Sequence, residues 1–422
     1  MKYVIVGNSA AAIGAVEGIR KVDKDSPITL ISDEPYHTYS RPLISYYLAG
    51  KVSQEKMYYR NEDFYQVNKV ETILGVKAEG LDAAEKVVTL LNGQKVGYDK
   101  LLIATGGKPF VPPNLILQKS GMYSFIKLDD VKEIEKIAKS GSKTVIIGAG
   151  LIGLKAAEGL AKLGVDITVV ELANRVLSAI LDEEAAAFVQ DNLEEHGIKF
   201  ELNTTADKIL GEDKVSGVVL QNGKELECDF LIVAIGVVPN TDLVKGSEVK
   251  LNRGIVVDEH METNVPGVYA AGDVSEGYDT IYKQQRVLPI LPNAYRQGEN
   301  AGKNMAGAES VYAGGFAMNS IGFFDYPMIT AGIIKPEGDE FESLVQSDPA
   351  CKSYKKIVLR QDVIVGFIYL NKVDRAGIIT GLISDQVNVS TFKQALLEDD
   401  FGYIDFPVEE RKVRMLKGGR SA

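Results

Sequence analysis

Two stretches of the chain repeat one arrangement: an apolar strand, a small-residue turn and an alanine-rich helical pattern. The first strand covers residues 3–6 and the second covers residues 144–147. A further apolar segment follows each helix, at 28–31 and at 167–170, and ends beside an acidic residue. Continuous apolar strands that alternate with helices are typical of βαβ units. The pattern predicts two parallel sheets with ligands at the carboxyl ends of their strands.

Further segments place these units within a larger α/β protein. Strands that run into glycine turns are expected at 98–107, 229–236 and 267–273. A polar helix is expected at 129–139, ahead of the second unit. A chain break and domain boundary is expected at Pro109, Pro112 and Pro113.

The C-terminal part alternates more like β structure, for example at 356–359 and 365–369, which predicts a separate α+β domain. The basic tail from Glu409 to Ala422 is expected to be mobile. The predicted domains are residues 1–110 with 241–312, residues 111–240, and residues 313–422.

Composition narrows the class of partner. The formal net charge of −11 argues against nucleic acid and anionic membrane, since both select basic surfaces, although a local basic patch for an acidic carrier protein is still compatible with it. Two isolated cysteines fit a reducing, cytoplasmic compartment. No apolar run approaches the ~20 residues of a membrane helix, and the strand at Tyr3 leaves no room for a targeting segment.

The second unit contains a complete GxGxxG motif, followed by an acidic residue at the end of the next strand. Gly148 permits the tight turn, Gly150 lets the backbone approach a pyrophosphate, and Gly153 lets helix and strand pack closely. Glu171 suits a ribose diol and favours NAD over NADP, a preference that the nearby Arg175 weakens. The remaining motif positions are Leu151 and Ile152, beside Ala149.

The first unit carries a degenerate copy of the same turn. Ser9 and Ala12 replace the second and third glycines after Gly7, and both residues are small enough for a pyrophosphate to approach. Asp33 and Glu34 follow the second strand and are the candidate ribose ligands. Ala10 lies inside the same turn.

The motifs, taken in order, resemble those of the FAD- and NAD-dependent pyridine nucleotide–disulfide oxidoreductase superfamily. The chain is most similar to rubredoxin reductases, the flavin module of NADH-dependent nitrite reductases, and the flavin-containing NAD-coupling subunit of phenylglyoxylate-type 2-oxoacid oxidoreductases. The resemblance implies two Rossmann-like, glutathione-reductase-like nucleotide-binding domains and a C-terminal α+β domain. It also implies FAD and NAD(H) as cofactors.

The resemblance assigns roles residue by residue. It places the FAD pyrophosphate at the first turn, the FAD ribitol on Asp273, and the pyrimidine end of the flavin at the helix that begins with Pro292 and Asn293. The other implied cofactor contacts are Arg41, Ala78, Ala104, Thr105, Gly106, Ile235, Gly236 and Gly272.

Two departures from the family pattern concern redox chemistry. Segment 39–47, where disulfide and peroxide-reducing branches carry a redox cysteine, has no sulfur, so Cys228 and Cys351 are interpreted as inert structural thiols. Many relatives pair a glutamate with a lysine near flavin N5, whereas this chain has Lys155 and Tyr46 at those positions. We expect Lys155 to reach toward the flavin N5 and the nicotinamide amide, with a helix-packing lysine as the alternative.

A third departure concerns the partner. The C-terminal part resembles the rubredoxin- and nitrite-reductase type through segments 353–356 and 373–377, but no Fe–S cysteines or sirohaem-type domain follow. A one-electron centre is therefore expected on another protein. His37, His196 and His260 fall in no motif, are interpreted as structural, and no metal site is expected.

The predicted function is electron transfer between NAD(H) and a protein-borne carrier. The carrier is a rubredoxin-like or Fe–S protein, or a larger oxidoreductase complex in which the chain is a subunit. The direction of electron flow and the oligomeric state stay open, with a homodimer among the states considered. The alternatives are a partner-free NADH oxidase or peroxidase, and a flavin- and NAD-holding scaffold or redox switch.

Overall fold

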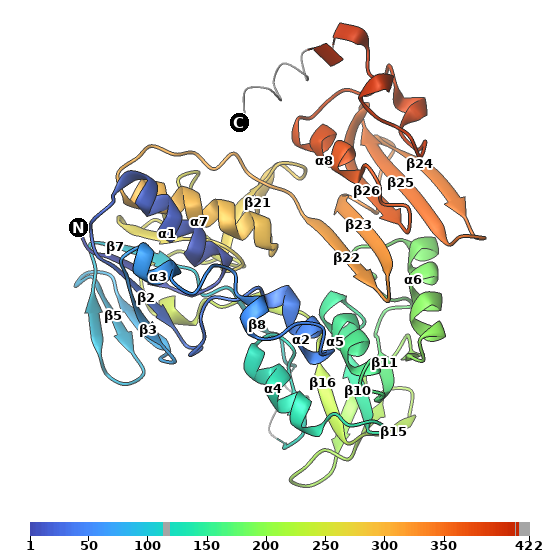
Figure 1. Cartoon of the computed structure of the whole chain (residues 1–422), viewed down its shortest axis with the longest axis horizontal. Helices are drawn as coiled ribbons and strands as arrows, with labels where there is room; N and C mark the ends of the chain where they lie inside the picture. Colours follow the sequence, from blue (N-terminus) through green and yellow to red (C-terminus); the bar gives the residue numbers. More distant parts are fainter. Residues whose placement is uncertain (113–118, 410, 413–422) are drawn as a thin grey trace. The chain divides into compact units, whose positions relative to one another are not determined.

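The computed structural model describes residues 1–112, 119–409, 411 and 412 (Figure 1). By their internal contacts these residues form two compact units. Unit 1 contains Met1–Gly148, Ile152–Val170 and Thr205–Ala317, and unit 2 contains Ala149–Leu151, Glu171–Thr204 and the described residues from Met318 onward. Among the described residues, no helix is both long enough and apolar enough to cross a membrane.

Unit 1 contains a parallel five-stranded sheet in the order β19-β7-β1-β2-β3. Its central strand β1 is buried along its whole length, as expected for a parallel strand covered on both faces. The strands are β1 (Tyr3–Val6), β2 (Ile28–Ser32), β3 (Val70–Leu74), β7 (Lys100–Ile103) and β19 (Val268–Ala270). Because β19 pairs with β7, a strand from the second half of the sequence completes a sheet that is otherwise made from the first hundred residues.

Two helices pack side by side on this sheet with their backbones in contact: α1 (Ala10–Val22) and α7 (Leu291–Met305) (Figure 1). Glycines four residues apart on each helix make the contact possible. A Cβ at Gly298 or Gly302 would overlap the carbonyl oxygen of Ala11 or Ala15 on α1. In the same way, Cβ atoms at Gly14 and Gly18 would overlap carbonyl oxygens of α7.

Smaller elements of unit 1 surround this layer. Three antiparallel groups of strands are formed by β4-β5-β6, by β13-β14-β15 and by β17-β8, and a mixed group is formed by β18-β20-β21. Their bounds are β4 (Ala78–Asp82), β5 (Val87–Leu90), β6 (Lys95–Gly97), β8 (Gly107–Pro109), β13 (Ala206–Leu210), β14 (Gly217–Leu220), β15 (Glu225–Glu227), β17 (Val237–Pro239), β18 (Ile255–Val256), β20 (Ser275–Asp279) and β21 (Gln284–Val287). The short helices are α2 (Ile44–Leu48) and α3 (Phe64–Val67).

A second parallel sheet in unit 1 contains the strands β11, β10, β16 and β9 in that order. It pairs β10 with β11 and with β16, and β16 with β9. The elements are β9 (Met122–Tyr123), α4 (Leu128–Ile137), β10 (Lys143–Ile147), α5 (Leu151–Ala161), β11 (Asp166–Val170) and β16 (Phe230–Val233). This is the second βαβ unit predicted from the sequence.

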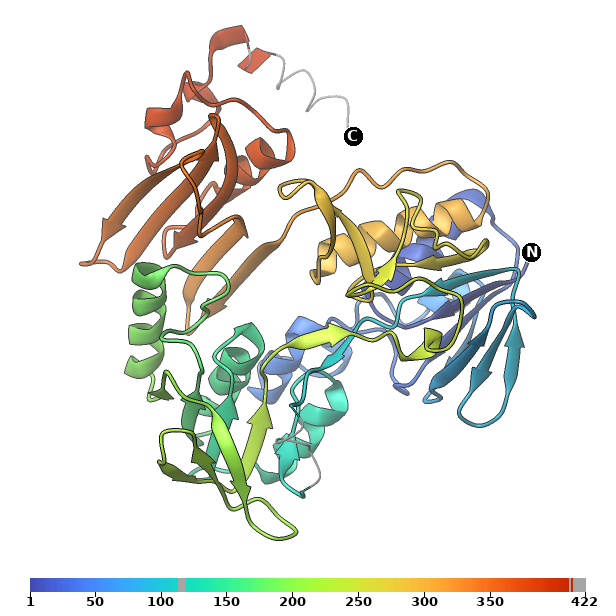
Figure 2. The same cartoon turned by 180° about the vertical axis from the view of Figure 1, so that it is seen from behind.

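Unit 2 is built around an antiparallel sheet in the order β22-β23-β26-β25-β24, whose strands lie side by side in both views (Figures 1 and 2). Its elements are α6 (Glu183–Glu195), β12 (Lys199–Glu201), β22 (Met318–Phe323), β23 (Tyr326–Gly332), β24 (Phe341–Asp348), β25 (Ser353–Arg360), β26 (Val363–Leu370) and α8 (Ala376–Ser384). Asp182 links α6 to this sheet, because its carboxylate accepts from Ala185 N, from the Tyr354 hydroxyl at 2.7 Å and from Lys356 Nζ at 2.9 Å.

The predicted fold class is confirmed. Both βαβ units form, the polar helix expected at 129–139 is α4, and the helix expected at Pro292 is α7, which begins one residue earlier. The C-terminal alternation corresponds to β25 and β26. Pro113, which was expected to mark a boundary, and most of the tail after Glu409 lie outside the described residues.

We predict that Gly298→Ala destabilises the protein, because the new methyl group overlaps backbone that cannot move aside. Overpacking of this kind costs roughly 1–3 kcal/mol. The matched control is Gly377→Ala in α8, where an added Cβ meets nothing within 4 Å. That substitution should be neutral or stabilise by about 0.5–1 kcal/mol. Thermal unfolding of both variants checks the prediction, and equal midpoints would contradict it.

Candidate functional site

The first glycine turn places a helix N-terminus at the carboxyl end of β1. Gly7 has a φ of +130°, and a Cβ there would collide with the carbonyl of Ala104. Ser9 is the N-cap residue of α1, and its side chain makes no capping hydrogen bond with the helix. Ala10 and Ala12 follow inside the helix and are buried. The turn thus presents helix N–H groups and a hydroxyl, which is a suitable site for a phosphate.

The two candidate ribose carboxylates differ in their surroundings. Asp33 is partly exposed and forms an ion pair with Lys127 at 2.6 Å. Glu34 is buried, accepts from the Tyr39 hydroxyl at 2.6 Å and forms an ion pair with Arg41 at 2.5 Å. Arg41 also donates to the carbonyl of Ile126 at 3.2 Å. Glu34 and Arg41 are therefore held together as a fixed pair, whereas Asp33 lies at the surface.

Asp273 is a partly buried carboxylate at the end of a glycine turn. Burial raises its pKa to about 6, although Arg41 acts in the opposite direction. Gln297 on α7 holds the turn, because its side-chain oxygen accepts from Gly272 N at 2.8 Å and from Ser275 Oγ at 3.4 Å. A carboxylate in this position can accept hydrogen bonds from a polyol and would lose its unfavourable burial energy by doing so.

The first turn of α7 contains the other two residues predicted at the flavin. Pro292 lies within this turn, where a missing N–H costs no helical hydrogen bond. Asn293 is buried and donates to the carbonyl of Phe316 at 3.4 Å. Ala78, predicted to contact adenine, is the first residue of β4.

Two of the predicted turns are held against each other. Thr105 Oγ1 donates to the carbonyl of Asn240 at 2.7 Å, and Asn240 N donates to the carbonyl of Gly106 at 2.8 Å. Gly106 and Gly236 both have positive φ, and added Cβ atoms would meet nothing within 4 Å. Ile235 packs with the apolar cluster beneath. The turns predicted at FAD and at the nicotinamide are thus fixed by shared backbone hydrogen bonds.

The second glycine motif has the geometry expected of its two outer glycines. Gly148 has a φ of +108° and a Cβ there would lie 2.5 Å from the Ala234 carbonyl oxygen. A Cβ at Gly153 would overlap the carbonyl of Gly148 itself. Both positions therefore exclude every residue except glycine.

Within unit 2, the middle of the motif lies beside Glu171. The Glu171 carboxylate accepts from Ala149 N at 2.7 Å and from Ala173 N at 2.8 Å. A Cβ at Gly150 would meet nothing within 4 Å, so the backbone is open to a close ligand. Arg175 donates to the Asn174 side chain at 2.7 Å. Leu151 is partly buried, as is Ile152 in unit 1.

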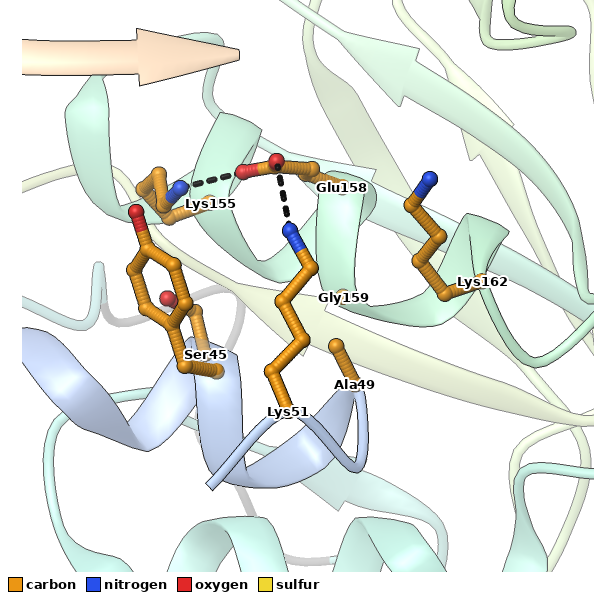
Figure 3. Close-up of a pocket in the computed structure, with 8 residues that line it drawn as sticks. Ser45, Ala49, Lys51, Lys155, Glu158, Gly159 and Lys162 are labelled. Carbon is orange, nitrogen blue, oxygen red and sulfur yellow. Dashed lines mark hydrogen bonds and ion pairs between the residues drawn. The ribbon is translucent and has the colours of Figure 1, made fainter. Parts of the chain in front are cut away.

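Lys155 and Tyr46 come together in a small pocket between α2 and α5 (Figure 3). The Lys155 ammonium lies 4.7 Å from the centre of the Tyr46 ring, and that of Lys51 lies 5.2 Å from it. Glu158 forms an ion pair with Lys155 and lies 4.0 Å from Lys51. Ser45, Ala49, Gly159 and Lys162 complete the lining.

The acid in this pocket was missed by the sequence analysis. The resemblance implies a glutamate at the position of Lys155 in many relatives, but here the carboxylate is supplied one helical turn later by Glu158. Spacing of i and i+3 on a predicted helix is visible in the sequence. The participation of Lys51 depends on how α2 packs on α5, and the sequence contains no local sign of it.

The two cysteines differ in exposure, and the three histidines each contact a backbone carbonyl. Cys228 is buried, which raises the pKa of its thiol to about 11, in accord with an inert thiol. Cys351 is instead exposed and its thiol donates to Asp348 at 2.9 Å, because it lies in the tight turn between β24 and β25. The interpretation of Cys351 as an inert structural thiol stays a prediction. Each histidine makes a ring hydrogen bond to a backbone carbonyl: His37 to Arg60, His196 to Asn192 and His260 to Ser310.

The raised pKa of Asp273 predicts a pH dependence of stability. Because the folded-state pKa of about 6 exceeds the ordinary value of 3.8, the folded state binds this proton more tightly than the unfolded state. The resulting stabilisation is fully present below pH 3.8 and is lost as the pH rises through 6. In urea unfolding of the cofactor-free protein, lowering the pH from about 7.5 to about 5 should stabilise the wild type relative to Asp273→Asn by about 1–2 kcal/mol. Parallel pH profiles of the two proteins would rule the effect out.

Comparison with known proteins gives matches along most of the chain. Residues 1–298 match the family model described as pyridine nucleotide-disulphide oxidoreductase, and residues 318–387 match the rubredoxin NAD+ reductase C-terminal domain. The epsilon subunit of NADH-dependent phenylglyoxylate dehydrogenase from Aromatoleum evansii is 32% identical over 397 residues, which cover 93% of each chain.

Of two other similar proteins, one is about twice as long as this chain and the other is less identical in sequence. Nitrite reductase [NAD(P)H] from Bacillus subtilis is 31% identical over 94% of this chain, but the chain spans only 49% of that relative. Putidaredoxin reductase, solved as a covalent complex with putidaredoxin, is 24% identical, with a TM-score of 0.86 and 98% of both chains covered. The chain belongs to the pyridine nucleotide-disulphide oxidoreductase family, whose members are FAD- and NAD(H)-dependent oxidoreductases.

Proposed function

We propose that this protein transfers electrons between NAD(H) and a one-electron carrier located on another protein. The observation that carries the proposal is segment 39–47, which has no sulfur where thiol-dependent branches carry a cysteine, and whose Ser45 and Tyr46 line the pocket between α2 and α5. With no thiol there, two-electron disulfide or sulfenate chemistry has no nucleophile. The electrons must then leave by another route, and a protein carrier is the route that the family resemblance favours.

The chain's own residues fit FAD in the first βαβ unit. Ser9 and the N-terminus of α1 would hold the pyrophosphate, Glu34 with Arg41 would hold the ribose end, and Asp273 would accept from the ribitol. The raised pKa of Asp273 and the side chain of Ser9, which does not cap its helix, both fit a polar ligand at these positions. When bound, the flavin supplies the exchange between hydride and single electrons.

The residues of the second βαβ unit fit NAD. The open backbone at Gly150 suits a pyrophosphate, and Glu171 retains lone pairs for a ribose diol after it accepts from Ala149 and Ala173. The Glu171 carboxylate would repel a 2′-phosphate, which favours NAD over NADP. The hydrogen bond from Thr105 to the Asn240 carbonyl holds the turn predicted at FAD against the turn predicted at the nicotinamide, within unit 1.

Two forms of the proposal differ in their partner. A free-standing reductase would serve a rubredoxin-like or Fe–S protein, as rubredoxin reductases do. A permanent subunit would pass electrons between NAD and a larger oxidoreductase, a form supported by the near full-length match to the phenylglyoxylate dehydrogenase subunit. We propose a cytoplasmic location, which suits the two unpaired cysteines.

We further propose that Lys155 assists hydride transfer between the two cofactors. Its ammonium is buried and held by Glu158 beside the Tyr46 ring, so it supplies fixed positive charge without reorganisation. Glu158 acts as a positioning residue, because its carboxylate forms an ion pair with the Lys155 ammonium, and Lys51 lies 4.0 Å from the same carboxylate.

The function is tested by anaerobic oxidation of NADH by the purified FAD-containing chain. One reaction contains rubredoxin as acceptor and the other contains an artificial dye. We expect fast turnover in both reactions for a free-standing reductase, and fast dye reduction alone for a subunit, in which case affinity capture from the native host should recover the complex. Rapid oxygen consumption without any carrier would contradict the proposal and indicate an oxidase.

The role of Lys155 is tested by stopped-flow reduction of the bound flavin by NADH. Lys155→Met should lower the rate constant roughly tenfold to a hundredfold, because one preorganised charge is removed. Lys162→Met is the matched control, since Lys162 follows the last residue of α5 and lines the same pocket. Equal rates in wild type and Lys155→Met would leave Lys155 as a helix-packing residue.

A further inference from the structure

The segment between the two predicted flavin contacts forms a hairpin whose first strand is largely buried and whose residues 282–285 are exposed. Strands β20 and β21 follow Asp273 directly and precede Pro292 at the start of α7. Strand β20 packs against α7, because Gly277 leaves room for the side chain of Gln297. The hairpin is thus attached on both sides to residues that we propose to hold the flavin, and it lies in the same unit as they do (Figure 1).

The acidic and the basic side chains of this segment differ in burial. Residues 274–298 contain two acidic side chains, Glu276 and Asp279, and both are buried. Glu276 accepts from Gly254 N at 2.8 Å, and Asp279 forms an ion pair with Arg286 at 3.1 Å. The basic side chains of the segment are the exposed ones. As a result the charged side chains that this segment exposes are basic, on a chain whose net charge is −11.

The basic side chains lie among exposed aromatic rings. Lys283 and Arg296 are exposed, and the Arg286 side chain is 38% exposed. Tyr278 and Tyr282 are 39% and 44% exposed, and the Arg286 guanidinium lies 4.0 Å from the centre of the Tyr282 ring. Tyrosine and arginine are the residues most enriched at the energetic centres of protein interfaces.

We infer that this surface, formed by Tyr278, Tyr282, Lys283 and Arg286 of the hairpin together with Arg296 of α7, is the docking site of the electron carrier, and that the carrier presents an acidic face. The inference rests on the proposed function and adds the place and the charge of the contact. A chain of net charge −11 repels an acidic protein at long range, so a local positive surface is needed to steer it. The position of this surface beside the flavin contacts suits a carrier that must receive electrons there.

The test uses the FAD-containing full chain, NADH and a rubredoxin of net negative charge. The variant is Lys283→Asp with Arg296→Glu; Arg286 is kept because its loss would leave Asp279 buried without its partner. Aspartate is chosen at position 283 because the backbone there has a φ of +53°, which aspartate tolerates. At low salt the KM for rubredoxin should rise about tenfold or more, and the difference should shrink as salt is added.

The matched control is Lys24→Asp with Lys95→Glu, which makes the same change in net charge at two exposed lysines of the same unit. NADH turnover with the dye should be unchanged in both variants, since neither touches the nucleotide sites. If wild type reduces rubredoxin and the hairpin variant matches the control, the docking site is wrong and the proposed function stands. If wild type reduces the dye but neither binds nor reduces rubredoxin, the docking inference fails and the subunit form of the proposed function stands.

Discussion

The close contact between α1 and α7 is the constraint on which the proposed flavin site depends. The N-terminal end of each helix carries a residue predicted to touch the cofactor, Ser9 as the N-cap of α1 and Pro292 in the first turn of α7, so the packing of their backbones sets where two helix N-termini point. Glycines on each helix take the place of side chains at the contact, and this leaves no freedom to slide or tilt. Gln297 extends the same constraint to the Asp273 turn through its hydrogen bond to Gly272.

Much of this architecture could be predicted from the sequence, because local rules determine it. Gly148 and Gly153 need glycine for steric reasons that a motif records, and the strands β1 and β16 are apolar and buried along their whole length. The pairing of α1 with α7 was not foreseen, although both helices carry glycines four residues apart. Such spacing shows that a helix can approach another closely, but not which helix it meets.

The candidate site shows the same division. The meeting of Lys155 and Tyr46 follows from positions that the family shares, but Glu158 and Lys51 were found only in the structure. Their roles depend on how α2 lies on α5, which involves residues a hundred positions apart. The difference between Asp33 and Glu34 could not be predicted for the same reason. Asp33 pairs with Lys127 and Glu34 pairs with Arg41, and these ion pairs form only when the chain is folded.

The order of strands in the first sheet bears on how the protein is made. Strand β19 and helix α7 come from residues 268–305, whereas the rest of that layer is made from the first 103. During synthesis the chain therefore releases an incomplete layer, with the glycine face of α1 uncovered, while the second βαβ unit is translated. The second βαβ unit, which lies in the sequence between β7 and β19, can form during that interval. The flavin layer closes only when α7 emerges, so ribosome-bound chains that end before it should lack the capacity to retain FAD.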